Sequence, residues 1–236
     1  MPGLRFVDNV LFDLDGTLVD SSRTIVDAIE HALNTLDVAP GGVQVERLIG
    51  QPLYDIFMKT YGLPRERALQ AIDVYREHYD RLNQSGTRVY DGVREGLAGL
   101  RAEGYGLYIA TVKPTPIADK VLLDLGLRKH FNGVAGASMG PERRDKQRII
   151  AWALNKFDLD PNTSLMVGDR DQDVEGARGN GLASVAVHYG FGQAEELRRA
   201  QPDHTADCFQ DVVRLVLGEP VEDKAVEAGN HRGLIE

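Results

Sequence analysis

Two aspartates, Asp13 and Asp15, lie two positions apart where an apolar stretch ends in a glycine-containing turn. Side chains two residues apart on an extended strand point the same way, so both carboxylates can face one small volume. Two anions repel each other at such short range unless a cation offsets their charge, and a divalent metal with oxygen ligands would do so. The local sequence leaves a second interpretation, a turn that caps the next helix, because Asp-Gly is common in turns.

Three further segments place polar groups where predicted elements begin or end. One apolar stretch ends at Thr111, a second ends at Gly168 and Asp169, and Asp173 follows four residues later. Lys146 begins a segment whose apolar residues have helical spacing. In an open parallel sheet, ligands bind outside the carboxyl ends of the strands, at the point where the strand order reverses. We therefore predict that carboxylates, a hydroxyl and an ammonium group from four segments meet at one edge of a sheet.

At these residues the sequence resembles the phosphatase branch of the haloacid dehalogenase superfamily. The four motifs of that family correspond in chain order to Asp13 through Thr17, Thr111, Lys146, and Gly168-Asp169 with Asp173. The resemblance extends over nearly the whole chain. Residues 49–53, 111–114 and 166–170 are similar to phosphatases described as phosphoglycolate phosphatase-like or 5'-nucleotidase-like.

Two positions depart from the family pattern. Many relatives carry prolines after the third-motif lysine, whereas none follows Lys146 here. Val112 stands where relatives often have Ser or Asn. Only the backbone N–H of Val112 would therefore be available to a phosphate.

The resemblance implies a Mg²⁺-dependent hydrolase that forms an aspartyl-phosphate. Asp13 would attack the phosphorus of a phosphate monoester. Asp15 would protonate the leaving oxygen and then take a proton from the water that hydrolyses the intermediate. The predicted catalytic residues are Asp13, Asp15, Thr111 and Lys146. The predicted metal ligands are Asp13, Asp169 and the backbone carbonyl of Asp15, with Asp173 supporting them through water or Lys146.

The substrate is expected to be a small phosphorylated metabolite. Lys146, Thr111 and the backbone N–H groups from Leu14 to Gly16 would hold the phosphate oxygens. The predicted substrate contacts are Thr17, Gln51, Val112 and Lys113. Arg47 and Lys59 are further candidates for touching the leaving group, which the sequence itself does not identify.

The order of the predicted elements indicates an α/β fold. Strand and helix patterns alternate after residue 105, which predicts a doubly wound parallel sheet of the Rossmann-like kind. About 95 residues separate Phe12 from Leu107, whereas a crossover between parallel strands needs only about a dozen. Apolar residues at helical spacing fill this gap, from a helix capped by Ser21 or Ser22 onward, and they predict an inserted helical cap domain. The expected boundaries are 1–18 and 88–218 for the core, 19–87 for the cap and 219–236 for a C-terminal tail.

Composition excludes several classes of protein. The 236 residues carry 27 basic and 36 acidic side chains, a net charge of −9, which argues against a nucleic-acid-binding surface. No stretch resembles a signal peptide or a membrane span, so we expect a cytoplasmic protein without nucleic-acid or membrane partners. The sequence does not indicate the oligomeric state.

Four other functions remain as alternatives. A 5'-nucleotidase would use the same chemistry on another substrate. A dehalogenase has no leaving oxygen to protonate, so Asp15 argues against it. A mutase of the β-phosphoglucomutase type must hold a second phosphate in the cap, and such relatives carry a Lys and a Ser-Arg where this chain has Ile49, Pro52 and Leu53. A non-catalytic regulatory protein on the same fold is disfavoured by the intact set of acids.

Overall fold

The computed structural model describes residues 7–82, 86–138 and 143–221. A parallel six-stranded sheet forms the core, in the order β5-β4-β1-β6-β7-β8. The strands are β1 Asn9–Phe12, β4 Gly106–Pro114, β5 Gly133–Ala137, β6 Ser164–Gly168, β7 Ala183–Val187 and β8 His204–Ala206. The chain starts at the centre of the sheet, runs to one edge and then returns to build the other side. The α/β class and the doubly wound parallel sheet predicted from the sequence are confirmed.

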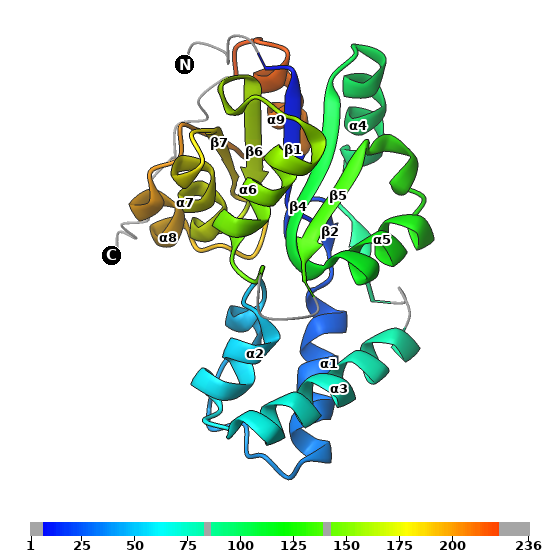
Figure 1. Cartoon of the computed structure of the whole chain (residues 1–236), viewed down its shortest axis with the longest axis vertical. Coiled ribbons are helices and arrows are strands. Elements are labelled where there is room, and N and C mark those ends of the chain that lie inside the picture. The colour runs from blue at the N-terminus through cyan, green and yellow to red at the C-terminus, as the bar shows by residue number, and fades with distance from the viewer. Residues whose placement is uncertain (1–6, 83–85, 139–142, 222–236) are drawn as a thin grey trace, which may run out of the picture.

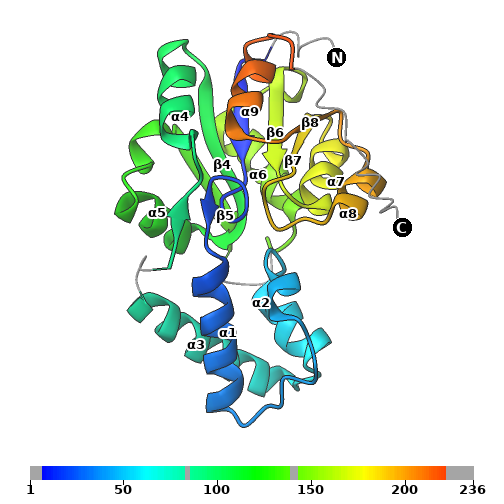
Figure 2. The same cartoon turned by 180° about the vertical axis from the view of Figure 1, so that it is seen from behind.

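Both faces of the sheet are covered by helices, because alternate side chains of each strand point to opposite faces. Leu11 belongs to the core beneath α6 and α7, whereas Val10 and Phe12 belong to the core shared with α4, α5 and α9. Figure 1 shows α6 in front of the sheet, and Figure 2 shows α4 and α9 on the opposite face. The helices of the core are α4 Val93–Ala102, α5 Thr115–Asp124, α6 Lys146–Phe157, α7 Asp171–Gly179, α8 Ala194–Ala200 and α9 Phe209–Val216. Two short helical turns, η3 Arg128–His130 and η4 Pro161–Thr163, also belong to it.

A helical insert, here called the cap, leaves the core between two short strands. β2 Val19–Asp20 and β3 Arg88–Val89 pair antiparallel at the crossing. The cap contains α1 Ser22–Thr35, η1 Val45–Leu48, α2 Leu53–Asp55, the π-helical turn η2 Ile56–Thr60 and α3 Arg65–Leu82. The long helices α1 and α3 pack on each other, and the cap lies beyond the carboxyl end of β1 (Figure 1).

The first cap helix is capped differently from the prediction. Ser21 occupies the N-cap position, but its hydroxyl does not bind the helix N-terminus. The side chain of Asp20 accepts the backbone N–H of Ser22 at 3.0 Å and the Ser22 hydroxyl at 2.6 Å instead. Asp20 therefore satisfies the free backbone donor, and the hydroxyl of Ser21 is available for another contact.

One strand differs in extent from the sequence prediction. β4 continues past Thr111 to Pro114, with a register shift that lets Pro114 pair with Ala137. The expected C-terminal tail begins after α9, and its residues 222–236 lie outside the described part of the chain. Among the described helices, none is long and apolar enough to cross a membrane.

Candidate active site

Asp13 is the first residue after β1, and its backbone N–H donates to the carbonyl of Val167 at 2.9 Å, which holds it at the centre of the sheet. Lys146, at the start of α6, places Nζ 2.9 Å from Asp13 Oδ1 and 2.7 Å from Asp173 Oδ1. The same ammonium donates to the carbonyl of Ala110 at 2.9 Å. Burial opposes the charged form of Lys146, but the carboxylates of Asp13 and Asp173 raise its pKa. The structure thus brings the predicted third-motif lysine to the predicted nucleophile.

Three buried carboxylates, Asp13, Asp169 and Asp173, form what we call the carboxylate cluster. Each offers an oxygen, and these oxygens lie within 4.8 Å of one another. Burial and the neighbouring carboxylates of Asp173 and Asp13 raise the pKa of Asp169 to about 8. Burial also raises the pKa of Asp173 to about 6, although Lys146 opposes the change. One ammonium group therefore does not offset the charge of the cluster.

Asp169 is held on both oxygens. Thr17 donates its hydroxyl to Oδ1 at 3.0 Å, and the backbone N–H of Phe191 donates to Oδ2 at 2.8 Å. Thr17 is fully buried, and its predicted contact with the substrate stays a prediction. Its hydroxyl orients a member of the carboxylate cluster, because the turn after β1 brings it beside the end of β6.

Two glycines leave the space around Asp169 open. Gly16 has φ +88°, a conformation that favours glycine, and a Cβ there would lie 2.2 Å from Asp169 Oδ2. A Cβ on Gly190 would lie 2.3 Å from both Asp169 Cβ and the Gly16 carbonyl oxygen. The loop after β7, which contains Gly190 and Phe191, is thus part of the site, although the sequence analysis did not include it. Gly190 and Gly192, which lie just after a predicted strand, were the sequence signal that could have indicated this loop.

The carboxylate cluster fits a divalent cation. All its ligand atoms are oxygens, which suit a hard cation, and three carboxylates beside one ammonium group leave negative charge that a cation would offset. The side chain of Asp15 is not a member of the cluster. The predicted binding of the metal by the backbone carbonyl of Asp15 stays a prediction.

We expect the stability of the metal-free protein to fall between about pH 4 and about pH 8. Asp169 has a pKa of about 8 when folded, against about 3.9 in an unfolded chain. Between these values the folded state keeps a proton that the unfolded state has lost, so stability decreases as pH rises. Because a divalent metal displaces that proton, its stabilising effect should grow over the same range.

Thermal unfolding with EDTA and with Mg²⁺, at about pH 5 and about pH 8, measures this effect. The Asp169→Asn variant should lose most of the pH dependence, whereas Asp8→Asn, an exposed control, should keep it. A Mg²⁺-induced shift of Tm that is equal at both pH values contradicts the expectation.

Asp15 is held apart from the cluster by two donors. The hydroxyl of Ser21 donates to Oδ1 at 2.6 Å, and Lys113 Nζ lies 2.9 Å from Oδ2. Lys113 also donates to the hydroxyl of Tyr79 in the cap at 3.0 Å. Burial opposes the charged form of Lys113, but Asp15 and Tyr79 raise its pKa. Lys113, predicted as a substrate contact, thus joins the predicted general acid to the cap.

The predicted phosphate-binding donors are only partly available. The N–H of Gly16 donates to the carbonyl of Val19 at 2.8 Å, so this donor is already paired, and its predicted contact with a phosphate stays a prediction. The turn needs this hydrogen bond to close. Thr111 is buried at the end of the strand pairing between β4 and β5, and its hydroxyl accepts the backbone N–H of Lys113 at 3.3 Å.

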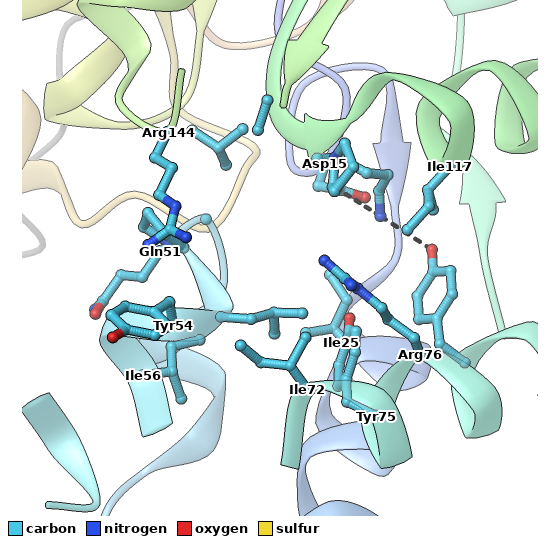
Figure 3. Close-up of a pocket in the computed structure, with 18 of the residues that line it drawn as sticks. Asp15, Ile25, Gln51, Tyr54, Ile56, Ile72, Tyr75, Arg76, Ile117 and Arg144 are labelled. Atoms are coloured by element: carbon cyan, nitrogen blue, oxygen red, sulfur yellow. Dashed lines mark hydrogen bonds and ion pairs between the residues drawn. The ribbon is translucent and has the colours of Figure 1, made fainter. Parts of the chain in front are cut away.

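A cavity of about 250 Å³ lies between the cap and the core, with Asp15 and Lys113 in its wall (Figure 3). Gln51 and Val112 line it, so these two predicted substrate contacts face the right space. Lys59 does not line the cavity, because its side chain is 75% exposed and pairs with Asp55 one turn away. Arg47 lines a separate, smaller pocket.

The N-terminus of α7, which follows β6 closely, also contacts the cap. The side chain of Arg170 donates to the carbonyl of Ile49, and Gln172 Nε2 donates to the carbonyl of Gly50 at 2.7 Å. Both donors are near Asp169 in the chain. The segment from Asp169 to Gln172 therefore connects the carboxylate cluster with the cap.

Comparison with known proteins fits this geometry. The sequence profile described as haloacid dehalogenase-like hydrolase matches residues 10–187. The chain belongs to the haloacid dehalogenase-like hydrolases. The family resemblance inferred from the four motifs is confirmed, and the chain is an enzyme of the phosphatase kind within this family.

Among haloacid dehalogenase-like hydrolases, a 5'-nucleotidase of Pseudomonas aeruginosa is 39% identical over 83% of this chain and 89% of its own length. A protein named tyrosine-protein kinase PtkA from Mycobacterium tuberculosis is 38% identical over 79% of this chain, which spans 64% of that relative. A solved structure of a predicted phosphatase from Clostridium acetobutylicum superposes with a TM-score of 0.85 at 33% identity, covering 90% of this chain and 99% of that one.

Proposed function

We propose that the protein hydrolyses the phosphate monoester of a small phosphorylated metabolite, with Mg²⁺ and through an aspartyl-phosphate on Asp13. The observation that carries the proposal is the separation of two acids with different surroundings. Asp13 lies in the carboxylate cluster beside Lys146, whereas Asp15 faces the cavity beside Lys113. This separation supports the proposal that one acid attacks phosphorus and the other transfers a proton to the leaving group.

The residues divide the reaction between them. Asp13 attacks phosphorus, and Lys146 holds both its carboxylate and the incoming phosphate oxygens. Asp15 gives a proton to the ester oxygen of the departing alcohol, which lies on the cavity side. In the second step Asp15 takes a proton from the water that attacks the aspartyl-phosphate. Mg²⁺ held by the carboxylate cluster, when bound, neutralises the charge that would otherwise keep an anionic phosphate away from an anionic nucleophile.

Phosphate release from p-nitrophenyl phosphate tests the function. We expect turnover with Mg²⁺ and loss of at least about 99% of the activity after exhaustive treatment with EDTA, because without a cation the cluster repels the substrate. Adding Mg²⁺ back should restore turnover. Ca²⁺ should inhibit, since its larger and looser coordination shell would misplace Asp13.

Full activity after removal of metal would refute the metal requirement, and no turnover with Mg²⁺ or Mn²⁺ would refute the phosphatase proposal. A screen of phosphoglycolate, nucleoside monophosphates and sugar phosphates then separates the proposed phosphoglycolate phosphatase-like activity from the 5'-nucleotidase alternative. Isomerisation of a sugar phosphate without net phosphate release would indicate the mutase. We further propose that the enzyme works in the cytoplasm and needs no nucleic-acid or membrane partner.

A further inference from the structure

Arg76 is a cationic residue of the cavity to which the reaction described above gives no role. It lies on α3, and Figure 3 shows its guanidinium group extending into the cavity on the side facing Asp15. Its Nε is buried without a hydrogen-bond partner among the described residues. A buried donor without a partner costs free energy, and a guanidinium group has five N–H donors to satisfy. This position therefore fits an anion that arrives with a ligand.

Most other charged residues around the cavity have neighbours of their own, and Asp73, one turn before Arg76 on α3, is exposed. Lys113 pairs with Asp15 at 2.9 Å, and Asp80 pairs with Lys120 of the core at 2.6 Å. The guanidinium of Arg144 packs over the ring of Tyr54 at 4.6 Å. Arg76 thus differs from these residues in having no ion pair with a described residue, so its guanidinium group is available to a ligand.

Most of the remaining wall is apolar. Its aliphatic side chains include Ile25, Leu48, Ile56, Ile72 and Ile117. Such a wall suits a short carbon chain and leaves few polar groups to select among neutral alcohols. The planar fork of a guanidinium group binds carboxylate and phosphate groups through two parallel hydrogen bonds.

We propose that Arg76 determines substrate specificity by binding a second anionic group, a carboxylate or a phosphate, on the alcohol part of the ester. The inference rests on the proposed function, which places the departing alcohol next to Asp15 and hence in this cavity. The substrate class is then a short phosphorylated acid or bisphosphate. A nucleoside monophosphate has no second anion on its nucleoside part, so it is disfavoured.

Binding of unreactive phosphonates tests Arg76 without relying on turnover. 3-Phosphonopropionate and propylphosphonate have the same phosphonate group and similar length, but only the first carries a carboxylate. Calorimetry with Mg²⁺ should show the wild type binding 3-phosphonopropionate at least about tenfold more tightly, as expected for charge-assisted hydrogen bonds in a partly buried site. Arg76→Gln should reduce this ratio to about two, and Arg76→Lys should give an intermediate value because it keeps the charge but not the fork.

Two control variants make the result specific. Arg81→Gln removes a guanidinium group from an exposed position of the same helix and should leave the ratio unchanged. Arg144→Gln removes the other guanidinium group of the cavity. If Arg144→Gln abolishes the preference and Arg76→Gln does not, the proposal is wrong. It is also wrong if the wild type fails to prefer 3-phosphonopropionate or binds neither phosphonate.

Ethane-1,2-bisphosphonate distinguishes the two anions. If it binds more tightly than 3-phosphonopropionate, the second group is a phosphate; if it binds more weakly, the second group is a carboxylate.

Turnover gives a second readout: the ratio of kcat/KM for phosphoglycolate to kcat/KM for ethyl phosphate should fall by about tenfold or more in Arg76→Gln. A wild type that binds 3-phosphonopropionate selectively but hydrolyses no ester would refute the proposed function and leave the anion site standing. Preferred hydrolysis of AMP over phosphoglycolate by the wild type would overturn the anion site alone.

Discussion

Replacing Asp13 by Asn is expected to lower kcat/KM by about three to four orders of magnitude for every phosphate ester, because an amide cannot form the covalent intermediate. This loss corresponds to about 4 to 5.5 kcal/mol of transition-state stabilisation. The substitution keeps the size of a side chain that is only 2% exposed, so the fold should persist. Phosphate release from an aryl ester and an alkyl ester, with Mg²⁺ in excess, measures the effect.

The matched control is Asp8→Asn, which removes an exposed carboxylate just before the opposite end of β1 and should leave kcat/KM within about twofold. Circular dichroism and Tm establish that both variants fold. Turnover of Asp13→Asn within about tenfold of the wild type, in a preparation free of host phosphatase, would show that Asp13 is not the nucleophile.

The sheet and the meeting of four motifs could be predicted because they depend on local signals. An apolar stretch followed by a polar residue marks the carboxyl end of a strand, and parallel strands bring these ends to one edge. Asp13, Lys146 and Asp169 therefore lie together as their positions in the chain indicated. Similarly, the gap between Phe12 and Leu107 predicted an insert, because no simple crossover is that long.

The contacts that close the site across long chain distances could not be predicted. The bond from Thr17 to Asp169 joins residues 152 positions apart, and local sequence favoured other roles for Thr17. The contact of Lys113 with Tyr79 depends on the β4 extension and on where the cap comes to rest. Lys59 was misplaced because one face of a short helix cannot be assigned without its neighbours. In each case tertiary packing decided between conformations that the sequence left equivalent.

The core and the cap have different roles: the core carries the catalytic groups, and the cap carries residues proposed to select the substrate. The core supplies the carboxylate cluster and Lys146, whereas the cap supplies Gln51, Arg76 and much of the apolar wall. Cap and core meet at Asp15, whose carboxylate is held by Ser21 from the first cap crossing and by Lys113, which also contacts Tyr79. Proton transfer to the leaving group is thus the step at which the position of the cap bears directly on the chemistry.

Replacing Asp15 by Asn should therefore affect substrates according to their leaving groups. An alkyl phosphate needs a proton on its departing oxygen, so kcat/KM should fall by about two to four orders of magnitude. A p-nitrophenolate ion leaves without a proton, so the first step on p-nitrophenyl phosphate should continue while hydrolysis of the aspartyl-phosphate slows. Rapid mixing should then show a burst of one equivalent of p-nitrophenolate per site, followed by slow turnover, and intact-protein mass should show one added phosphoryl group.

The contrast between the two esters makes this result specific to proton transfer. In the Asp15→Asn variant the new side chain is nearly the same size as the aspartate and can still accept the hydrogen bond from Ser21. Because the buried ammonium of Lys113 loses its carboxylate partner, Tm and circular dichroism establish that the variant folds. Asp91→Asn, which changes an exposed carboxylate beyond β3, is the control and should show neither the loss nor the burst. A decrease by one common factor for alkyl and aryl esters, without phosphoenzyme, would place Asp15 in positioning the phosphate. The residue that protonates the leaving group would then have to be sought elsewhere in the cavity wall, where Lys113 Nζ lies 2.9 Å from Asp15 Oδ2.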